Sequence, residues 1–194
     1  RGIVLGIVGM PVRIVAPAPT PGGTLNVGDV ISAGDELRVG TGEQVALLWD
    51  HRAVLTLHEG ARMNIQESHR GQTELLLHQG MVRIALSYNA GRMTDTLTLQ
   101  TPLARVVSRG GIMEATVLGG ERQSLLARLI TAPPGYTLRV LEGQARVEPL
   151  TGDRKAFSLK AGTEFALRTG MVTSLSELQE GSHVPQPLAV REEH

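Results

Sequence analysis

At residues 25–41 the chain reads LNVGDVISAGDELRVGT, a run of alternating aliphatic residues that two Gly-Asp pairs interrupt. Such pairs are typical of tight corners, because glycine reaches positive φ at no steric cost and a short carboxylate can bond the next backbone amides. The stretch therefore predicts strand, corner, strand, corner, strand. The corners fall at Gly28-Asp29 and Gly34-Asp35, and the candidates for the buried face are Leu25, Val27, Val30 and Ile31.

A similar unit recurs four times further along the chain. In each copy an alternating apolar strand leads to a glycine, and a second alternating strand follows. The copies form two pairs, and within each pair the glycines fall about 20 residues apart, a spacing typical of stacked β-hairpins or solenoid rungs. One such unit cannot bury its apolar face alone, so its neighbours must cover it. The copies span residues 55–65, 75–84, 139–147 and 157–165.

The core of these strands must be aliphatic, since the 194 residues include only one Trp, two Tyr and two Phe. Small branched residues in short runs, together with 23 Gly, suit closely spaced strands and tight corners. We therefore predict an all-β fold of mostly antiparallel short strands, arranged as a β-sandwich or as solenoid-like stacking of hairpins. At most two short helices are expected, at residues 119–135 and after Ser174.

The chain opens with a second apolar segment, RGIVLGIVGMPVRIVA, followed by a connection rich in Pro and Gly. A strand buried on both faces has this composition. The connection could act as a hinge that lets the segment pair with a neighbouring copy. The alternative is that it pairs within its own domain. The residues predicted to carry self-association are Ile3, Val4, Leu5, Ile7, Val8, Val12, Ile14 and Val15.

These observations divide the chain into four parts. They are an N-terminal apolar strand at 1–16, a hinge at 17–24, a β domain at 25–172 with an insertion at 119–135, and a short helix with a tail at 173–194. The opening apolar run is too short to span a bilayer, so we expect no membrane span. The start at Arg1 suggests a processed or trimmed end, and we expect a soluble mature molecule.

Charge and cysteine content restrict the function further. The formal net charge is zero, which gives no general attraction to nucleic acid and permits self-association. The chain has no Cys, so disulfides and thiolate sites are excluded, and both the cytoplasm and an envelope compartment remain compatible.

Histidine and carboxylate side chains are the candidates for a chemical site. His58 and His78 precede the corner glycines of two adjacent units, where two imidazoles could bind a metal with His51 as a third ligand. The alternative is that polar residues simply occupy a solvent-facing corner. Likewise, Asp29, Asp35, Glu36 and Asp50 could form a calcium site or an acid–base pair, or serve as turn residues.

Enzyme signatures are missing from the sequence. It has no nucleophile elbow, no phosphate-binding glycine loop and no dinucleotide fingerprint. We therefore expect a non-enzymatic protein without a cofactor.

Several weak motifs, in order, resemble the FecR-type domain across residues 4–168. What the resemblance implies is an extracytoplasmic β-rich domain without catalytic residues. In that family it lies behind a membrane helix and a cytoplasmic anti-sigma segment, and it receives a signal from an outer-membrane receptor. This sequence departs from the family at Gly111, where Thr is common, and at the insertion. The motifs are Val8-Gly9-x-Pro11-Val12, residues 25–35, Thr41-Gly42, residues 46–50, Leu55-x-Leu57 with Ile65, Gly80-x-Val82, Thr101-Pro102-x-Ala104-x-Val106-x-x-Arg109-Gly110, residues 141–147 and Leu159-x-Ala161-Gly162.

The functional prediction is a self-associating structural protein of the cell envelope or extracellular space, an oligomer or filament joined by terminal strands. Deleting Gly2–Val15 is then expected to leave folded protein that does not assemble. The alternative is a periplasmic signal-receiving module or one that binds cell wall or glycan. It would differ by being monomeric and by saturable binding to a partner.

Overall fold

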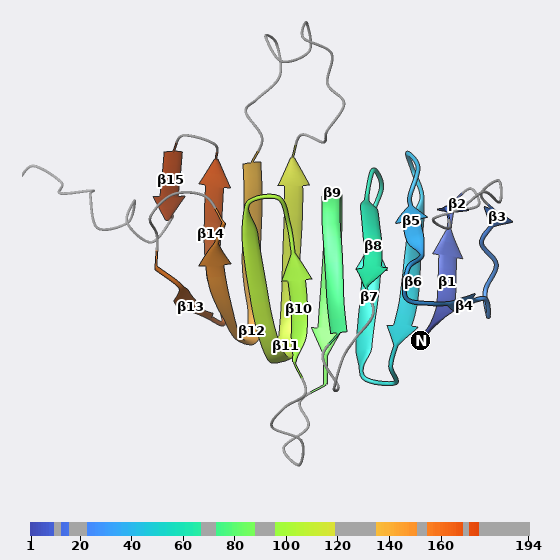
Figure 1. Cartoon of the computed structure of the whole chain (residues 1–194), viewed down its shortest axis with the longest axis horizontal. Helices are drawn as coiled ribbons and strands as arrows, with labels where there is room; N and C mark the ends of the chain where they lie inside the picture. The colour runs from blue at the N-terminus through green and yellow to red at the C-terminus, as the bar shows by residue number, and fades with distance from the viewer. Residues whose placement is uncertain are drawn as a thin grey trace, which may run out of the picture.

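The computed structural model describes residues 1–9, 13–15, 23–66, 73–87, 96–118, 135–150, 155–168 and 171–174, and none of them is helical. The all-β prediction is confirmed. The strands form one hydrogen-bonded network (Figure 1). They are β1 (Gly2–Val8), β2 (Arg13–Val15), β3 (Gly23–Thr24), β4 (Val30–Ile31), β5 (Glu36–Arg38), β6 (Gln44–Trp49), β7 (Ala53–Leu57), β8 (Arg62–Gln66), β9 (Thr73–Leu86), β10 (Leu97–Gln100), β11 (Ala104–Leu118), β12 (Gly135–Pro149), β13 (Phe157–Lys160), β14 (Thr163–Arg168) and β15 (Met171–Ser174).

The network is folded into two layers because its longest strands serve both. The first half of β9 pairs with β8 and β10, whereas its second half pairs with β7 and β11. Layer A contains β4, β1, β6, β7, the second halves of β9 and β11, the first half of β12, β14 and β15. Layer B contains β3, β2, β5, β8, β10, β13 and the remaining halves of β9, β11 and β12. Pairing is antiparallel in the described residues except between β9 and β10.

Three glycines let strands cross between layers without ending. Gly80, Gly111 and Gly143 have φ of 82°, 104° and 82° within β9, β11 and β12. A Cβ on Gly111 would collide with the Glu142 carbonyl oxygen, and one on Gly80 would collide with the backbone of Ala61. These strands therefore run 14 or 15 residues, where the sequence predicted short strands that stop at each corner.

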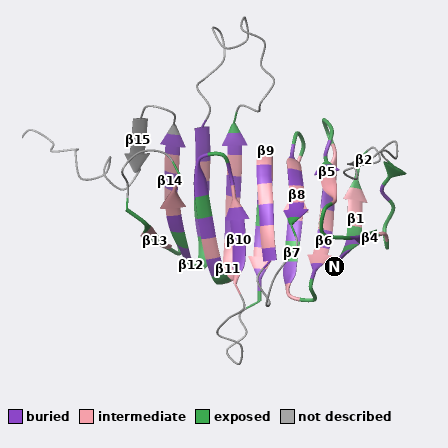
Figure 2. Ribbon diagram, in the orientation of Figure 1, coloured by how far each residue is buried: buried purple, intermediate pink, exposed green. Residues whose placement is uncertain are grey.

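The core lies between the layers and is built from alternating positions of both, as the burial colours in Figure 2 show. It is one cluster that is aliphatic except for Trp49, Tyr136 and Phe165, as the composition predicts. The single Trp joins the layers by a polar contact as well. Trp49 of β6 donates its indole N–H to the hydroxyl of Thr73 at the start of β9, over 3.2 Å, and both side chains are buried.

The opening Gly-Asp stretch is confirmed in part. Leu25 and Ile31 are buried as predicted, but Val27 and Val30 are 64% and 58% exposed. Val30 precedes Ile31 on a strand and so must face the other side of the sheet. Val27 lies in a turn that closes with the Asp29 amide donating to the Asn26 carbonyl.

The N-terminal strand pairs with its own chain in this structure. β1 lies between β4 and β6, and β2 pairs with β3 and β5. Residues 23–24 of the predicted hinge form β3, and residues 173–174 of the predicted helical tail belong to β15. The rest of the hinge, the insertion at 119–134 and residues 175–194 lie outside the described residues. The described part contains no helix long and apolar enough to cross a bilayer.

Candidate functional site

The two histidines predicted as metal ligands lie on different sides of the Gly80 corner. His58 follows β7, where its backbone amide donates to the Met81 carbonyl at 3.0 Å. His78 lies in the layer B half of β9, and its Nε2 is 2.6 Å from the Asn64 side-chain oxygen. Within the described ranges, no three His, Cys, Asp or Glu side chains are placed to hold a metal ion.

The aspartates of the Gly-Asp corners act as turn residues. The Asp29 carboxylate accepts from the Asn26 amide and the Asp35 carboxylate from the Ser32 amide, each over 2.8 Å. The bonded backbone amides lie three residues before the aspartate, whereas the sequence pattern predicted bonds to the amides that follow it. Asp50 closes a tight turn with His51, both at positive φ, between β6 and β7.

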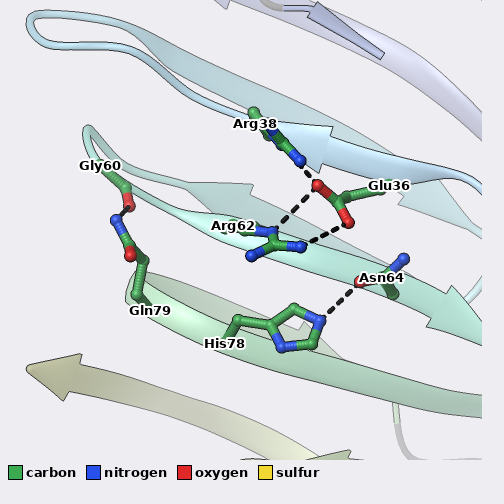
Figure 3. Close-up of polar contacts among 7 residues, drawn as sticks. All are labelled: Glu36, Arg38, Gly60, Arg62, Asn64, His78 and Gln79. Atoms are coloured by element: carbon green, nitrogen blue, oxygen red, sulfur yellow. Dashed lines mark hydrogen bonds and ion pairs between the residues drawn. The ribbon is translucent and has the colours of Figure 1, made fainter. Parts of the chain in front are cut away.

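Glu36 is the centre of a polar network on the outer face of layer B (Figure 3). Its carboxylate accepts two bonds from Arg62, at 3.0 and 3.1 Å, and one from Arg38. Beside this network, Asn64 of β8 and His78 of β9 form a hydrogen bond with each other. Burial raises the pKa of Glu36, but the hydrogen bonds and charges of Arg62 and then Arg38 outweigh burial and lower it. The carboxylate is therefore held ionised, which suits a structural clamp across β5 and β8.

A groove of about 1070 Å³ adjoins this network and reaches the buried Trp49–Thr73 pair. Its walls include Arg62, Asn64 and His78. Because these polar groups already bind one another or neighbouring groups, the groove is a weaker candidate for ligand binding than the outer face of layer A.

The outer face of layer A carries an apolar row that crosses six strands in register. Ile3 of β1 lies opposite both Val30 of β4 and Leu48 of β6. Leu48 is followed across the sheet by three further partners in successive strands. We define the apolar row as Val30, Ile3, Leu48, Val54, Ala85 and Ile112.

These side chains face outward because the residues that flank them along each strand are the buried ones, such as Val4, Leu47 and Leu55. Val30, Ile3 and Val54 are 58%, 38% and 36% exposed. An antiparallel sheet with one face in water normally carries polar residues on that face. A continuous apolar row there marks an interaction surface.

The neighbouring row on the same face has the usual polar character. It begins with Ala46 and Thr56 and continues with charges of alternating sign. Arg83 and Glu114 lie 3.3 Å apart, and Arg139 and Glu164 lie 3.8 Å apart. We call Arg83, Glu114, Arg139 and Glu164 the charged row. The continuous apolar row therefore lies beside a charged one, although single exposed apolar side chains, such as Leu5 and Leu118, also occur on strands of layer A.

The apolar row is hollowed over its part from β6 to β11. A depression of about 370 Å³ is lined by four of the row residues, and its lining also includes Arg52 and Glu142. Concave surfaces with apolar walls are suited to bind a protruding side chain of a partner. The row residues in the depression are Leu48, Val54, Ala85 and Ile112.

The predicted self-association residues divide between core and surface. Val4 is buried and Ile7 packs partly against the core. Ile3, Leu5 and Val8 are 38%, 48% and 62% exposed, and Ile3 belongs to the apolar row. Val12 lies outside the described residues, and Ile14 and Val15 belong to β2, whose side chains are not described.

Sequence reasoning missed the rest of the row because its members are far apart along the chain. Val54 and Ile112 interrupt strands that otherwise alternate, and this was the available signal. Only the register of five strand pairs shows that they lie side by side with Ile3.

Comparison with known proteins finds solved structures with a similar fold but no matching family. No family model matches the chain, and the search of curated proteins found no match. Two crystal structures of a candidate anti-sigma factor from Parabacteroides distasonis ATCC 8503, at 1.65 and 2.50 Å resolution, are similar. Each has a TM-score of 0.54 and 13% identity over 75% of this chain. The match covers 65% and 64% of those chains, just under two thirds of their length.

Proposed function

We propose that this chain is a non-enzymatic, extracytoplasmic signal-receiving domain that binds another protein through the apolar row. The observation that carries the proposal is the register of six outward-facing aliphatic residues beside a charged row on the same sheet face. Burying such a row in a protein contact removes apolar surface from water, which is the main favourable term in protein association.

The fold supports a receiving role. A β-rich body like that of a candidate anti-sigma factor fits a domain that senses a partner, and the FecR-type resemblance of the sequence agrees with it. The row contains only aliphatic side chains and no aromatic ring for stacking on a sugar, which favours a protein over a glycan. We propose that the partner presents an apolar ridge with one protruding side chain for the depression.

Site-specific photo-crosslinking in cells of the source organism tests this function. A photoreactive phenylalanine analogue replaces Val54 in the row, and the matched control carries it at Thr137, on the same face of layer A but outside the row. We expect one adduct of defined mass from position 54 and none from position 137. Equal yields from both positions, or no adduct from position 54, would contradict the proposal.

Self-association is the second candidate function, and the exposure of Ile3, Leu5 and Val8 on β1 favours it. In that case the adduct from position 54 has twice the 20.7 kDa mass of the chain. Sedimentation velocity of the purified chain provides an independent test, because a structural oligomer forms without any other protein. A single monomeric species across a hundredfold range of concentration would exclude this candidate.

A further inference from the structure

β13 forms one margin of layer B in the part of the chain that the structure describes, where it pairs with β12 (Figure 1). Just after it, Ala161 donates its amide to the Gly143 carbonyl over 3.0 Å. Backbone groups of an antiparallel strand alternate between its two sides. Phe157 and Leu159 therefore also turn their backbone groups toward β12.

The intervening residues of β13 turn their backbone groups to the open margin. The Lys160 carbonyl accepts a hydrogen bond from the Thr163 hydroxyl over 2.5 Å. The Ser158 amide and carbonyl and the Lys160 amide have no strand partner in the described residues. A row of such groups is a template for an added strand.

A cationic groove of about 890 Å³ lies beside this margin. Its lining includes Arg109, Arg146 and Lys160 and a single carboxylate, that of Glu142. Arg146 is paired with Glu148 over 3.2 Å. Arg109 and Lys160 are exposed and form no ion pair with any described side chain.

We propose that the β13 margin binds an extended peptide segment of a partner protein that carries acidic side chains. Main-chain bonds to Ser158 and Lys160 hold the segment as a further strand of layer B. Residues directly opposite in a strand pair share one face of the sheet. An acidic residue opposite Lys160 then lies beside Lys160 on the groove side of the sheet, whereas Arg109 on β11 lies two strands further in and adds longer-range attraction.

Charge complementarity decides which occupant is accepted. The two unpaired cations repel a basic segment. They also disfavour an uncharged segment, because it would remove water from them without supplying an opposite charge. The open backbone groups distinguish a peptide from other polyanions, because only a strand can satisfy them in register. This site lies in a different layer from the apolar row and goes beyond the proposed function.

Fluorescence anisotropy with the full chain and labelled eight-residue peptides tests the site. The probe alternates Val and Glu, and its counterpart has Lys in place of each Glu. Two further probes keep the Val-Glu sequence but are N-methylated on alternate residues, one set for each side of the strand. We expect the Val-Glu probe to bind and the Val-Lys probe to fail. One methylated probe should lose on the order of tenfold in affinity, and the other should bind normally.

Substitutions in the protein test whether the probe binds at β13. Lys160→Gln should weaken binding roughly two- to fivefold, the range of a cross-strand charge pair. Arg109→Gln should weaken it less, because Arg109 lies two strands from β13. Arg38→Gln, an exposed cation on β5 of the same layer, is the matched control and should leave affinity unchanged. Lys160→Glu should admit the Val-Lys probe.

Three outcomes overturn the inference. They are no binding of the Val-Glu probe, equal binding of both methylated probes, and equal weakening by Arg38→Gln. The second would show an anion groove that any polyanion can occupy, without strand addition. None of these outcomes bears on cross-linking at position 54, so failure here and failure of the proposed function are distinguishable.

Discussion

At the scale of single residues, glycine at positive φ has two separate roles in this chain. Gly162 occupies a turn between β13 and β14 with open space where a Cβ would stand. Gly111 has a similar φ but is pressed against the backbone of Glu142 in the paired strand. Gly162 relieves backbone strain only, whereas Gly111 also permits the close approach of two strands, β11 and β12.

This difference predicts unequal costs for the same substitution. Gly111→Ala should lower the free energy of unfolding by about 3 kcal/mol, because strain and overpacking add. Gly162→Ala should cost about 1 kcal/mol, from backbone strain alone. Urea unfolding of both variants measures the difference. Equal costs would mean that the β11–β12 corner is looser than the structure shows.

Glu36 predicts how stability depends on pH. Its pKa is lower in the folded chain than in the unfolded chain, so its contribution is present at neutral pH and is lost as pH falls through the folded pKa. Glu36→Gln should cost about 1 kcal/mol at pH 7. The difference from the parent should shrink below pH 4.5, the ordinary value for this group. Unfolding titrations at several pH values check this.

Glu142→Gln is the matched control for that experiment. Glu142 is exposed and makes no ion pair with a described side chain, so its removal should change stability by less than about 0.5 kcal/mol at any pH. A Glu36 effect that stayed constant from pH 7 to pH 3 would contradict the ion-pair account.

At the scale of elements, β1 is part of the core as well as of the surface. Val4 is 1% exposed, and Gly2 lies against the ring of Trp49. Removing residues 2–15 would uncover one side of β6 and the core beneath it. The structure therefore changes the expectation that this deletion leaves a folded chain, and point substitutions are the better test.

Val4→Ala and Ile3→Ala separate the two faces of β1. Val4→Ala should lower the free energy of unfolding by about 2 kcal/mol, since it leaves a cavity between the layers. Ile3→Ala should cost under about 1 kcal/mol, because Ile3 contacts only outward neighbours across the sheet. Denaturant unfolding measures both losses of stability. A larger loss for Ile3→Ala than for Val4→Ala would contradict the assignment of Val4 to the buried face of β1.

Alternation and corner glycines predicted most of the strands, but β3 and the end of β15 fall in segments predicted as a hinge and a helical tail. The repeating units around Gly60, Gly80, Gly143 and Gly162 correspond to β7–β8, β9, β12 and β13–β14. Sequence spacing could not show that β9 and β12 continue through their corners, because the same glycine serves a turn or a bent strand. Register across strands, which creates the apolar row, depends on long-range pairing and has no local signal.

At the scale of the whole molecule, the two layers present chemically different outer faces. Layer A offers the apolar row at one margin and the charged row beside it. Layer B offers the Glu36 network and the cationic groove at β13. A zero net charge brings no long-range attraction, so binding must depend on these local features.

The central claim is that the apolar row is the protein-binding surface. Its most direct test places the photoreactive phenylalanine analogue at Ala85 and measures the yield of the cross-linked adduct in cells. Ile3→Glu combined with Val54→Glu places two charges in the row, and Thr56→Glu combined with Thr116→Glu places two charges elsewhere on the same face. Both chains should remain folded, because all four positions face outward. The account predicts that the first chain loses the adduct and the second keeps it. Retention of the adduct by the first chain, or its loss from both folded chains, would contradict the account.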